Sequence, residues 1–275
     1  MLSPLATAAE DRILDTARQI EARLDARVGL AIYDTGSNTS WLYRAHERFP
    51  MASTFKVLAC GALLARRDAG HTDMEREVSI ARSDLVTYSP VTERWVGRGV
   101  TLDALCAATM RTSDNTAANK VLEVLGGPSG LTGFLREIGD DVTRVDRWET
   151  DLNEGLPGDA RDTSTPAAMA ASLRTLLLGD ALSSASKETL IGWLESNRVG
   201  GALLRAGLPD DWRIGDRTGA GGHGTRGVVA IVWPRDRAPL ILAVYITQTT
   251  ASMDQRNAAI AAVGRALAQT LRLLP

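Results

Sequence analysis

The stretch PMASTFKVLACGALLA, residues 50–65, is apolar from Phe55 onward and long enough for a helix, yet its first turn carries Lys56. A helix that is apolar on every side is normally buried, so a charged amine there is costly unless something requires it. Ser53 precedes it by three residues, a spacing that places both side chains on one helix face. A desolvated lysine loses its proton readily, and the neutral amine could then activate the serine as a nucleophile.

The S-x-x-K spacing does not establish this chemistry by itself. Lys56 could instead extend its amine to the surface at a helix end. The same spacing recurs at Ser184 and Lys187, in a polar segment that resembles a loop running into a helix start. The remainder of the chain must therefore distinguish a nucleophile from an ordinary surface lysine.

Outward from this helix, strand patterns occur near both ends of the chain and helical patterns fill the middle, residues 50–198. The predicted terminal elements are an amphipathic helix at 8–26, a hairpin at 28–36 and 40–49, strands at 211–219, 227–234 and 239–249, and a helix at 252–274.

This order predicts an α+β fold. Both termini build one antiparallel sheet of about five strands, the terminal helices flank it, and an all-helical domain is inserted. The expected domains are residues 1–50 with 199–275 for the sheet and 51–198 for the helices, with the active site in the cleft between them.

Composition excludes several function classes. The chain has 275 residues, 44% of them hydrophobic, and a net charge of -2 with no dense basic run, so we expect no nucleic-acid partner. No apolar stretch has the length of a membrane span. Residues 1–12 lack a basic start followed by an apolar segment, so we expect no intact signal peptide, and the protein is either intracellular or a mature form.

The histidines and cysteines add two constraints. His46, His71 and His223 are scattered without metal-ligand spacing, so we expect no metal, no cofactor and no Ser-His-Asp triad. Cys60 and Cys106 are either two inert thiols or one disulfide, and only the disulfide implies an oxidising compartment.

Two short motifs have ordinary structural explanations. Asp34-Thr35-Gly36 spells the aspartic-protease triplet, but no second copy exists, and a hairpin turn explains it better. Residues 219–224, GAGGHG, fit a dinucleotide-binding pattern, but a strand follows where that site needs a helix. We interpret both as turns.

Three further clusters bear on Lys56, each with an unremarkable alternative. Ser113-Asp114-Asn115 opens a predicted helix, where such residues are commonly N-caps. Glu149 and Asn153 lie in a loop flanked by Arg147 and Asp162, and charged loops are commonly just solvated. Arg217-Thr218-Gly219 ends a strand and Arg226 begins the next, where the two arginines could bind an anion or form an exposed cross-strand pair.

The order S-x-x-K, S-D-N and then an R-T-G variant of K-T-G matches the motif set of class A β-lactamases and penicillin-binding proteins. The chain resembles a class A serine β-lactamase over nearly its whole length, and hence a β-lactamase/transpeptidase-like fold. The phrases that carry the resemblance are FPMASTFK, DLVTYSPVTE, TSDNTAAN, ETDLNEGLPGDARDTSTP and GAGGHGTRG.

The resemblance implies roles for the catalytic residues. Ser53 would attack the lactam carbonyl, with Lys56 and Ser113 passing protons and Ser113 protonating the leaving nitrogen. Glu149 would act as base on a water held with Asn153, and either Lys56 or Glu149 would activate the serine. The backbone N–H groups of Ser53 and Ala220 would form the oxyanion hole.

The resemblance also implies a substrate site and two structural pairs. Asn115 would bind the side-chain amide of the substrate, the segment Arg217-Thr218-Gly219 with Arg226 would bind its carboxylate, and Tyr88 would border the entrance. Cys60 and Cys106 would form a disulfide, and Arg147 with Asp162 would pin the loop. The expected protein is a monomeric, exported bacterial enzyme, periplasmic or secreted, acting on small β-lactams.

Departures from the family pattern refine the expectation. Arg217 replaces the usual lysine, as in the carbenicillin-hydrolysing subgroup, and an arginine cannot release a proton. This predicts a penicillinase with good carbenicillin turnover. Ala52 and Gly221 exclude the extra cysteine pair of some carbapenem-hydrolysing members, so strong carbapenemase activity is not expected. Thr150 stands where the family often has a proline after a peptide bond that is commonly cis.

Two other functions compete. A penicillin-binding D,D-peptidase or penicillin sensor shares the serine-lysine chemistry but retains the acyl-enzyme, and the loop with Glu149 and Asn153 argues against it. A non-catalytic periplasmic binding protein would leave the Ser53–Lys56 pair and Glu149 without a purpose.

Overall fold

The computed structural model describes residues 4–273, with side chains from residue 12 onward. Residues 1–3 lie outside this range and belong to the predicted sheet domain and to the N-terminal segment without a signal-peptide pattern. Residue 274, the last of the predicted closing helix, also lies outside it. No described helix has the length and hydropathy that crossing a lipid bilayer requires.

One antiparallel sheet in the order β2-β1-β9-β8-β7 forms the centre of the molecule. Leu30 of β1 pairs with Val244 of β9, so the two ends of the chain meet in this sheet. This confirms the predicted α+β architecture. The strands are β1 (Arg27–Asp34), β2 (Ser40–Tyr43), β7 (Arg213–Ala220), β8 (Arg226–Trp233) and β9 (Leu240–Thr247).

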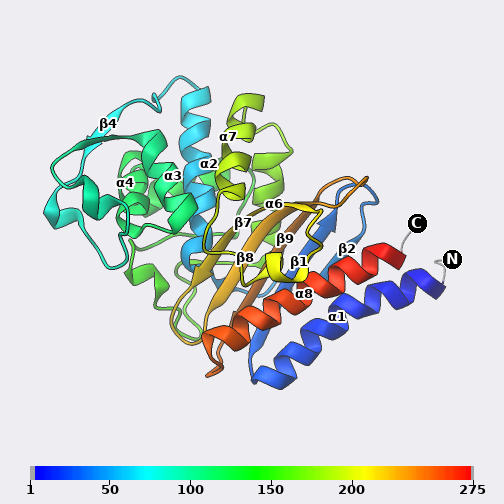
Figure 1. The fold of residues 1–275 in the computed structure, drawn as a ribbon. Coiled ribbons are helices and arrows are strands. Elements are labelled where there is room, and N and C mark those ends of the chain that lie inside the picture. Colours follow the sequence, from blue (N-terminus) through cyan, green and yellow to red (C-terminus); the bar gives the residue numbers. More distant parts are fainter. Residues whose placement is uncertain (1–3, 274–275) are drawn as a thin grey trace.

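Helices α1 (Pro4–Leu24) and α8 (Met253–Leu273) lie side by side over one face of the sheet (Figure 1). The predicted stripe on α1, including Ile13 and Ile20, is buried in one apolar cluster with residues of α8 and with Val228 and Val232 of the sheet. The central strands β8 and β9 are covered on both faces, which explains their nearly continuous apolar sequences.

The opposite face carries the helical block, with α2 (Phe55–Asp68) at its centre and α6 (Pro166–Leu177) against β1 and β9. Every residue from Phe55 to Leu64 is buried, because α2 packs against the other helices of the block. Those other helices are α3 (Leu102–Thr112), α4 (Asn115–Leu125), α5 (Gly127–Glu137) and α7 (Ser184–Glu195).

Two short antiparallel pairs, which the sequence analysis missed, occur at the edges of this block. They are β3 (Phe49–Pro50) with β6 (Thr163–Ser164), and β4 (Glu77–Ser79) with β5 (Gly99–Thr101). Strands of two or three residues are too short to show an alternating pattern. The predicted second hairpin strand also ends early, at Tyr43, because Arg44 adopts a left-handed conformation with φ 43°.

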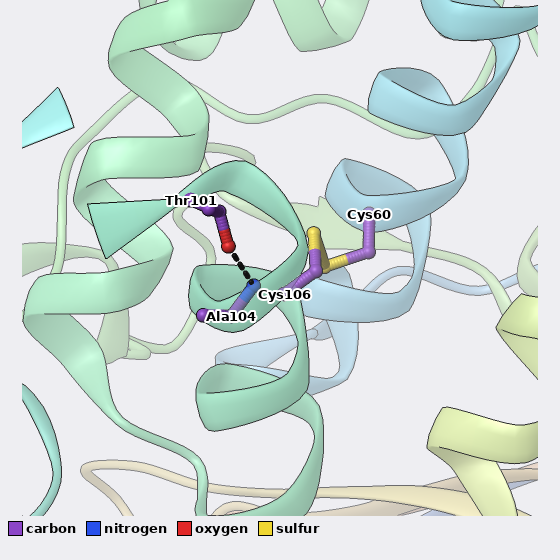
Figure 2. The surroundings of a disulfide bond; sticks show 4 residues. All are labelled: Cys60, Thr101, Ala104 and Cys106. Atoms are coloured by element: carbon purple, nitrogen blue, oxygen red, sulfur yellow. Dashed lines mark hydrogen bonds between the residues drawn. A yellow bond between two sulfur atoms is a disulfide. The ribbon is translucent and has the colours of Figure 1, made fainter. Parts of the chain in front are cut away.

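A disulfide joins α2 to α3 inside the helical block. Cys60 and Cys106 are fully buried, with their Cα atoms 5.7 Å apart, as the family resemblance predicted. Figure 2 shows that the Thr101 hydroxyl accepts a hydrogen bond from Ala104 N (3.2 Å), which caps the first turn of α3. The covalent link therefore connects the central helix to a capped neighbour.

We expect the Cys60→Ala/Cys106→Ala variant to lose stability. The closed loop spans 46 residues, and the chain-entropy relation for that length gives about 4 kcal/mol lost from the free energy of unfolding. Urea denaturation, with the reduced parent protein as control, measures the difference. Coincident transitions of the variant and the oxidised parent would show that the link does not stabilise the fold.

Candidate active site

Ser53 lies in a tight turn where the sheet side of the molecule meets α2. The 3₁₀ turn Ala52–Thr54 runs directly into α2, and Ala52 has a left-handed φ of 43°, unusual for a residue with a Cβ. The Ser53 side chain is largely buried, and its Oγ donates to Glu149 Oε1 at 3.2 Å. The hydroxyl therefore faces a carboxylate from a loop 96 residues away in sequence.

Lys56 is fully buried, so the interpretation of it as a surface-reaching lysine is wrong. Its Nζ forms an ion pair with Glu149 Oε1 (2.8 Å) and donates to Asn115 Oδ1 (2.5 Å) and to the Ser113 carbonyl oxygen (3.1 Å). Burial lowers the pKa of Lys56 to about 8, the Glu149 carboxylate opposes this shift, and Arg217 adds to it.

The second S-x-x-K sequence has a purely structural position. Ser183 caps the start of α7 by accepting from Ser186 N (3.2 Å), and Ser184 is exposed in the first turn. A buried environment around the lysine, and not the spacing, distinguishes the two occurrences.

Glu149 lies in the loop after α5 and is held by Asn119 from α4 and by Asn153 from the same loop. Asn119 on α4 bonds the Glu149 backbone twice, accepting from its N–H (2.9 Å) and donating to its carbonyl (2.8 Å). Asn153 Nδ2 donates to Glu149 Oε2, and the Glu149–Thr150 peptide bond is cis. Sequence analysis missed Asn119, although it follows Asn115 by one helical turn, a spacing that could have indicated it.

An ion pair closes the same loop at its ends. Arg147 Nε donates to Asp162 Oδ2 at 2.6 Å, and Asp162 Oδ1 accepts from the backbone N–H groups of Asp146 (2.7 Å) and Arg147 (3.0 Å). Asp162 is almost fully buried and Arg147 mostly so, which strengthens their attraction relative to a surface pair.

The Ser113-Asp114-Asn115 segment combines a cap with two residues of the site. Asp114 is the N-cap of α4, accepting from Ala117 N (2.9 Å), so the simple explanation holds for that residue. Ser113 has a left-handed φ of 66° at the end of α3, and Asn115 donates to the Thr87 carbonyl (2.9 Å) while accepting from Lys56. The turn thus directs Ser113 and Asn115 towards Lys56.

Two arginines lie on the sheet side of the site, and both are buried, which excludes the exposed cross-strand pair. Arg217 donates through Nη2 to Ser113 Oγ, while its Nε and Nη1 have no hydrogen-bond partner among the described residues. Arg226 donates to the Gly219 carbonyl (3.1 Å) and to Asn257 Oδ1 (2.8 Å) on α8. Burial lowers the pKa of each guanidinium to about 10, so both stay charged at neutral pH.

A cavity of 290 Å³ opens where these elements meet. Lys56, Glu149 and Arg217 lie buried behind its wall, and Tyr88, 54% exposed, stands at its mouth. Val199 is the one lining residue that sequence analysis did not select. The full lining is Ser53, Tyr88, Ser113, Asn115, Asn153, Val199, Thr218, Gly219, Ala220 and Arg226.

The two motifs interpreted as turns take that form. Asp34 Oδ1 accepts from Gly36 N (2.8 Å) in the connection between β1 and β2. Residues 219–224 end β7 and lead into β8, where Gly222 N donates to the Asn153 carbonyl (2.8 Å). This second turn therefore connects the sheet to the loop that carries Glu149.

The sheet with its inserted helices has the class A β-lactamase fold, with a buried serine, lysine and glutamate at the centre of its site. The chain belongs to the β-lactamase enzyme family, whose model matches residues 12–271. It is a β-lactamase, an enzyme that hydrolyses β-lactams.

Solved structures agree closely. The chain is 54% identical to an ancestral (GNCA) class A β-lactamase, covering 94% of this chain and 99% of that one, with a TM-score of 0.92. It is 52% identical to the class A β-lactamase of the last common ancestor of Gram-negative bacteria (GNCA4), with the same coverage and a TM-score of 0.93. The putative class A β-lactamase PenP from Rhodopseudomonas palustris is 52% identical, with coverage of 94% and 98% and a TM-score of 0.92.

We expect Lys56 to titrate near pH 8, because its burial disfavours the ammonium form. The chain has three lysines, Lys56, Lys120 and Lys187, so ¹³Cε-lysine NMR can follow each one. One resonance should shift with a midpoint at about 8, vanish in Lys56→Arg and persist in Lys120→Arg. If the lowest midpoint instead lies near the ordinary value of 10.5, the amine is not desolvated as described.

Proposed function

We propose that this β-lactamase is a penicillinase, carbenicillin included, and that it acts through a serine acyl-enzyme. One observation carries the proposal. Glu149 contacts Ser53 Oγ through Oε1 and Asn153 through Oε2, so one carboxylate serves the nucleophile and the place of the hydrolytic water. A protein that only binds or retains a β-lactam does not need that second contact.

In the acylation step, Ser53 Oγ attacks the lactam carbonyl carbon while its proton moves to Glu149 Oε1, the oxygen it already faces at 3.2 Å. Because the pKa of Lys56 is about 8, its amine is mainly charged at neutral pH and is a weaker candidate for this base. The N–H groups of Ser53 and Ala220 would hold the oxyanion.

As the lactam C–N bond breaks, the leaving nitrogen takes a proton from Ser113 Oγ, which is replenished from Lys56 Nζ at 3.3 Å. Arg217 donates to the same Ser113 oxygen. A guanidinium orients that hydroxyl but does not release its proton, so the relay runs through Lys56.

In the deacylation step, a water held by Glu149 and Asn153 attacks the ester carbonyl. Glu149 first passes the proton it took from Ser53 to the neutral Lys56 amine, 2.8 Å away, which restores both charges. It then accepts the water proton and returns it to Ser53 Oγ as that oxygen leaves, which restores the free enzyme. The Asn119 bonds to the Glu149 backbone and the Arg147–Asp162 pair support this role, because both restrict the loop that carries the base.

Substrate recognition follows from the remaining polar groups. Asn115 uses its oxygen for Lys56 and one N–H for Thr87, which leaves a second N–H for the side-chain amide of a penicillin. Thr218 and Arg226 would bind the ring carboxylate, and Tyr88 would border the entrance. Arg217 lies behind the cavity wall, and its positive charge would favour a substrate with additional negative charge through the field it adds to the site.

The cleft between the sheet domain (1–50 and 199–275) and the helical domain (51–198) is the proposed location of the reaction. The disulfide between Cys60 and Cys106 supports an oxidising location, periplasmic or secreted. We propose that the enzyme acts there as a monomer on small-molecule β-lactams.

We expect Glu149→Ala to form an acyl-enzyme slowly, with the Lys56 amine as the replacement base for Ser53, and then to retain it, because the base for the hydrolytic water is gone. Intact-protein mass spectrometry during benzylpenicillin exposure should find a lasting adduct on Ser53 in the variant, while the parent turns the antibiotic over and stays unmodified. Asp151→Ala, an exposed carboxylate of the same loop, is the matched control and should behave like the parent. A parent that stays acylated would indicate a D,D-peptidase or sensor, and no labelling at all would exclude the serine mechanism.

The second test concerns Arg217. The kcat/KM of the parent for carbenicillin should lie within about tenfold of that for benzylpenicillin. Arg217→Lys should lower the carbenicillin value several-fold more than the benzylpenicillin value, because a lysine buried there would lose its proton readily, and with it the attraction for a second carboxylate, whereas the guanidinium stays charged. Arg213→Lys, at an exposed position of the same strand, is the control. A parent value far below this range would refute the carbenicillin proposal.

A further inference from the structure

Tyr245 on β9 lies beneath the turn that carries Ser53, and nothing in the proposed chemistry uses it. The side chain is 1% exposed, and its hydroxyl lies 2.9 Å from Thr54 Oγ1. Thr54 follows the nucleophile directly in sequence. A phenol buried in the sheet therefore contacts the nucleophile turn without lining the cavity.

The proton count fixes the direction of this contact. Thr54 has one hydroxyl proton, and it donates that proton to the Met51 carbonyl at 2.7 Å. Tyr245 must then be the donor to Thr54 Oγ1. Burial raises the pKa of the Tyr245 phenol, which keeps that donor protonated. The result is a chain of two hydrogen bonds from the phenol to the Met51 carbonyl.

The Met51 carbonyl is the start of the turn that holds Ser53. It also accepts from Thr54 N at 3.1 Å, and Ala52, between the two residues, has the left-handed φ of 43°. Such a conformation is disfavoured for alanine and persists only where neighbours enforce it. The Tyr245–Thr54 and Thr54–Met51 hydrogen bonds act on the two ends of that strained segment.

The opposite side of the turn is fixed by β7. A Cβ placed on Gly219 would lie 2.8 Å from the Met51 carbonyl oxygen and 3.1 Å from Ser53 N. The turn is therefore confined between the β7 backbone and the Tyr245 hydroxyl. A shift of the turn would move Ser53 N relative to the end of β7, where the Ala220 N–H completes the proposed oxyanion hole.

Glycines on the two neighbouring strands leave room for the Tyr245 and Phe49 rings. In the strand register Tyr245 pairs with Gly29 on β1 and Gly227 on β8. A Cβ on Gly227 would meet the Tyr245 ring at 2.6 Å, and one on Gly29 would overlap the Phe49 ring. The rings of Phe49 and Tyr245 are nearly parallel, with centroids 6.1 Å apart, so the phenol is rigidly held.

We infer that Tyr245 is a positioning residue for the reaction, holding Ser53 and the oxyanion hole in register through the Thr54 hydroxyl and the Met51 carbonyl. The inference rests on the proposed role of Ser53 as nucleophile. It predicts that loss of the phenolic hydroxyl slows acylation even in fully folded enzyme, because small displacements of reacting groups have large effects on rate.

The test compares Tyr245→Phe with Ile241→Val, which removes a methyl group from a buried side chain on the same strand. Rapid-quench mass spectrometry with benzylpenicillin gives the acylation rate constant and the substrate dissociation constant. Both are measured at a temperature well below the Tm of each protein. We expect acylation in Tyr245→Phe to be about tenfold slower with an unchanged dissociation constant. Ile241→Val should lower Tm without slowing acylation.

Thr54 variants complete the test. Thr54→Ser keeps the hydroxyl and should retain the parent rate, whereas Thr54→Val should be slowed, and the Tyr245→Phe/Thr54→Val double variant should be no slower than Thr54→Val. Acylation at the parent rate in Tyr245→Phe, or additive effects in the double variant, would overturn the inference alone. Hydrolysis of benzylpenicillin by a Ser53→Ala variant at the parent rate would overturn the proposed function and the inference together.

Discussion

The buried ion pair between Lys56 and Glu149 is the interaction on which the arrangement of the site depends. Both side chains are fully buried, and their charged atoms lie 2.8 Å apart. Buried charges stabilise a fold only when partners satisfy them, and removing one partner leaves the other uncompensated. The surrounding elements provide those partners, with Ser113 and Asn115 for the amine and Asn153 for the carboxylate. The pair thereby joins α2, the turn before α4 and the loop between α5 and α6.

The Lys56–Glu149 pair lies next to the sheet because the two ends of the chain form one sheet that packs against the helical block. β7, the edge strand, carries Arg217 to the back of the cavity, and its closing turn bonds the Glu149 loop through Gly222 N and the Asn153 carbonyl (2.8 Å). The site therefore combines two buried guanidiniums and an amine with one carboxylate of the loop. Asp114 and Asp216 are further carboxylates that act on these cations, and Arg226, which lines the cavity, is the cation open to an anionic substrate.

Sequence patterns predicted the elements whose residues repeat over many positions. The apolar runs at β8 and β9 and the stripe on α1 each extend over two or more turns or strand repeats, and the structure has them within a few residues of the expected bounds. The motif residues were found because their types and order are distinctive. Asn119, with two hydrogen bonds to the Glu149 backbone, and Asn257, with one to Arg226, were missed because the sequence does not show which distant residue a polar side chain contacts. The β3–β6 and β4–β5 pairs were also missed, because strands of two or three residues show no alternating pattern.

The same contrast explains why the sheet contributes more to the chemistry than its sequence suggests. β9 is an uninterrupted buried strand, and by pattern alone Tyr245 is one more core aromatic. Its hydroxyl nevertheless needs a partner once buried, since an unsatisfied buried polar group is costly. That partner is Thr54 Oγ1, at the start of α2. A polar group in an apolar core thus restricts how the helical block can sit on the sheet, because only one placement satisfies it. The turn that carries Ser53 is the point where this restriction acts, so under the proposed mechanism packing and catalysis would depend on the same contact.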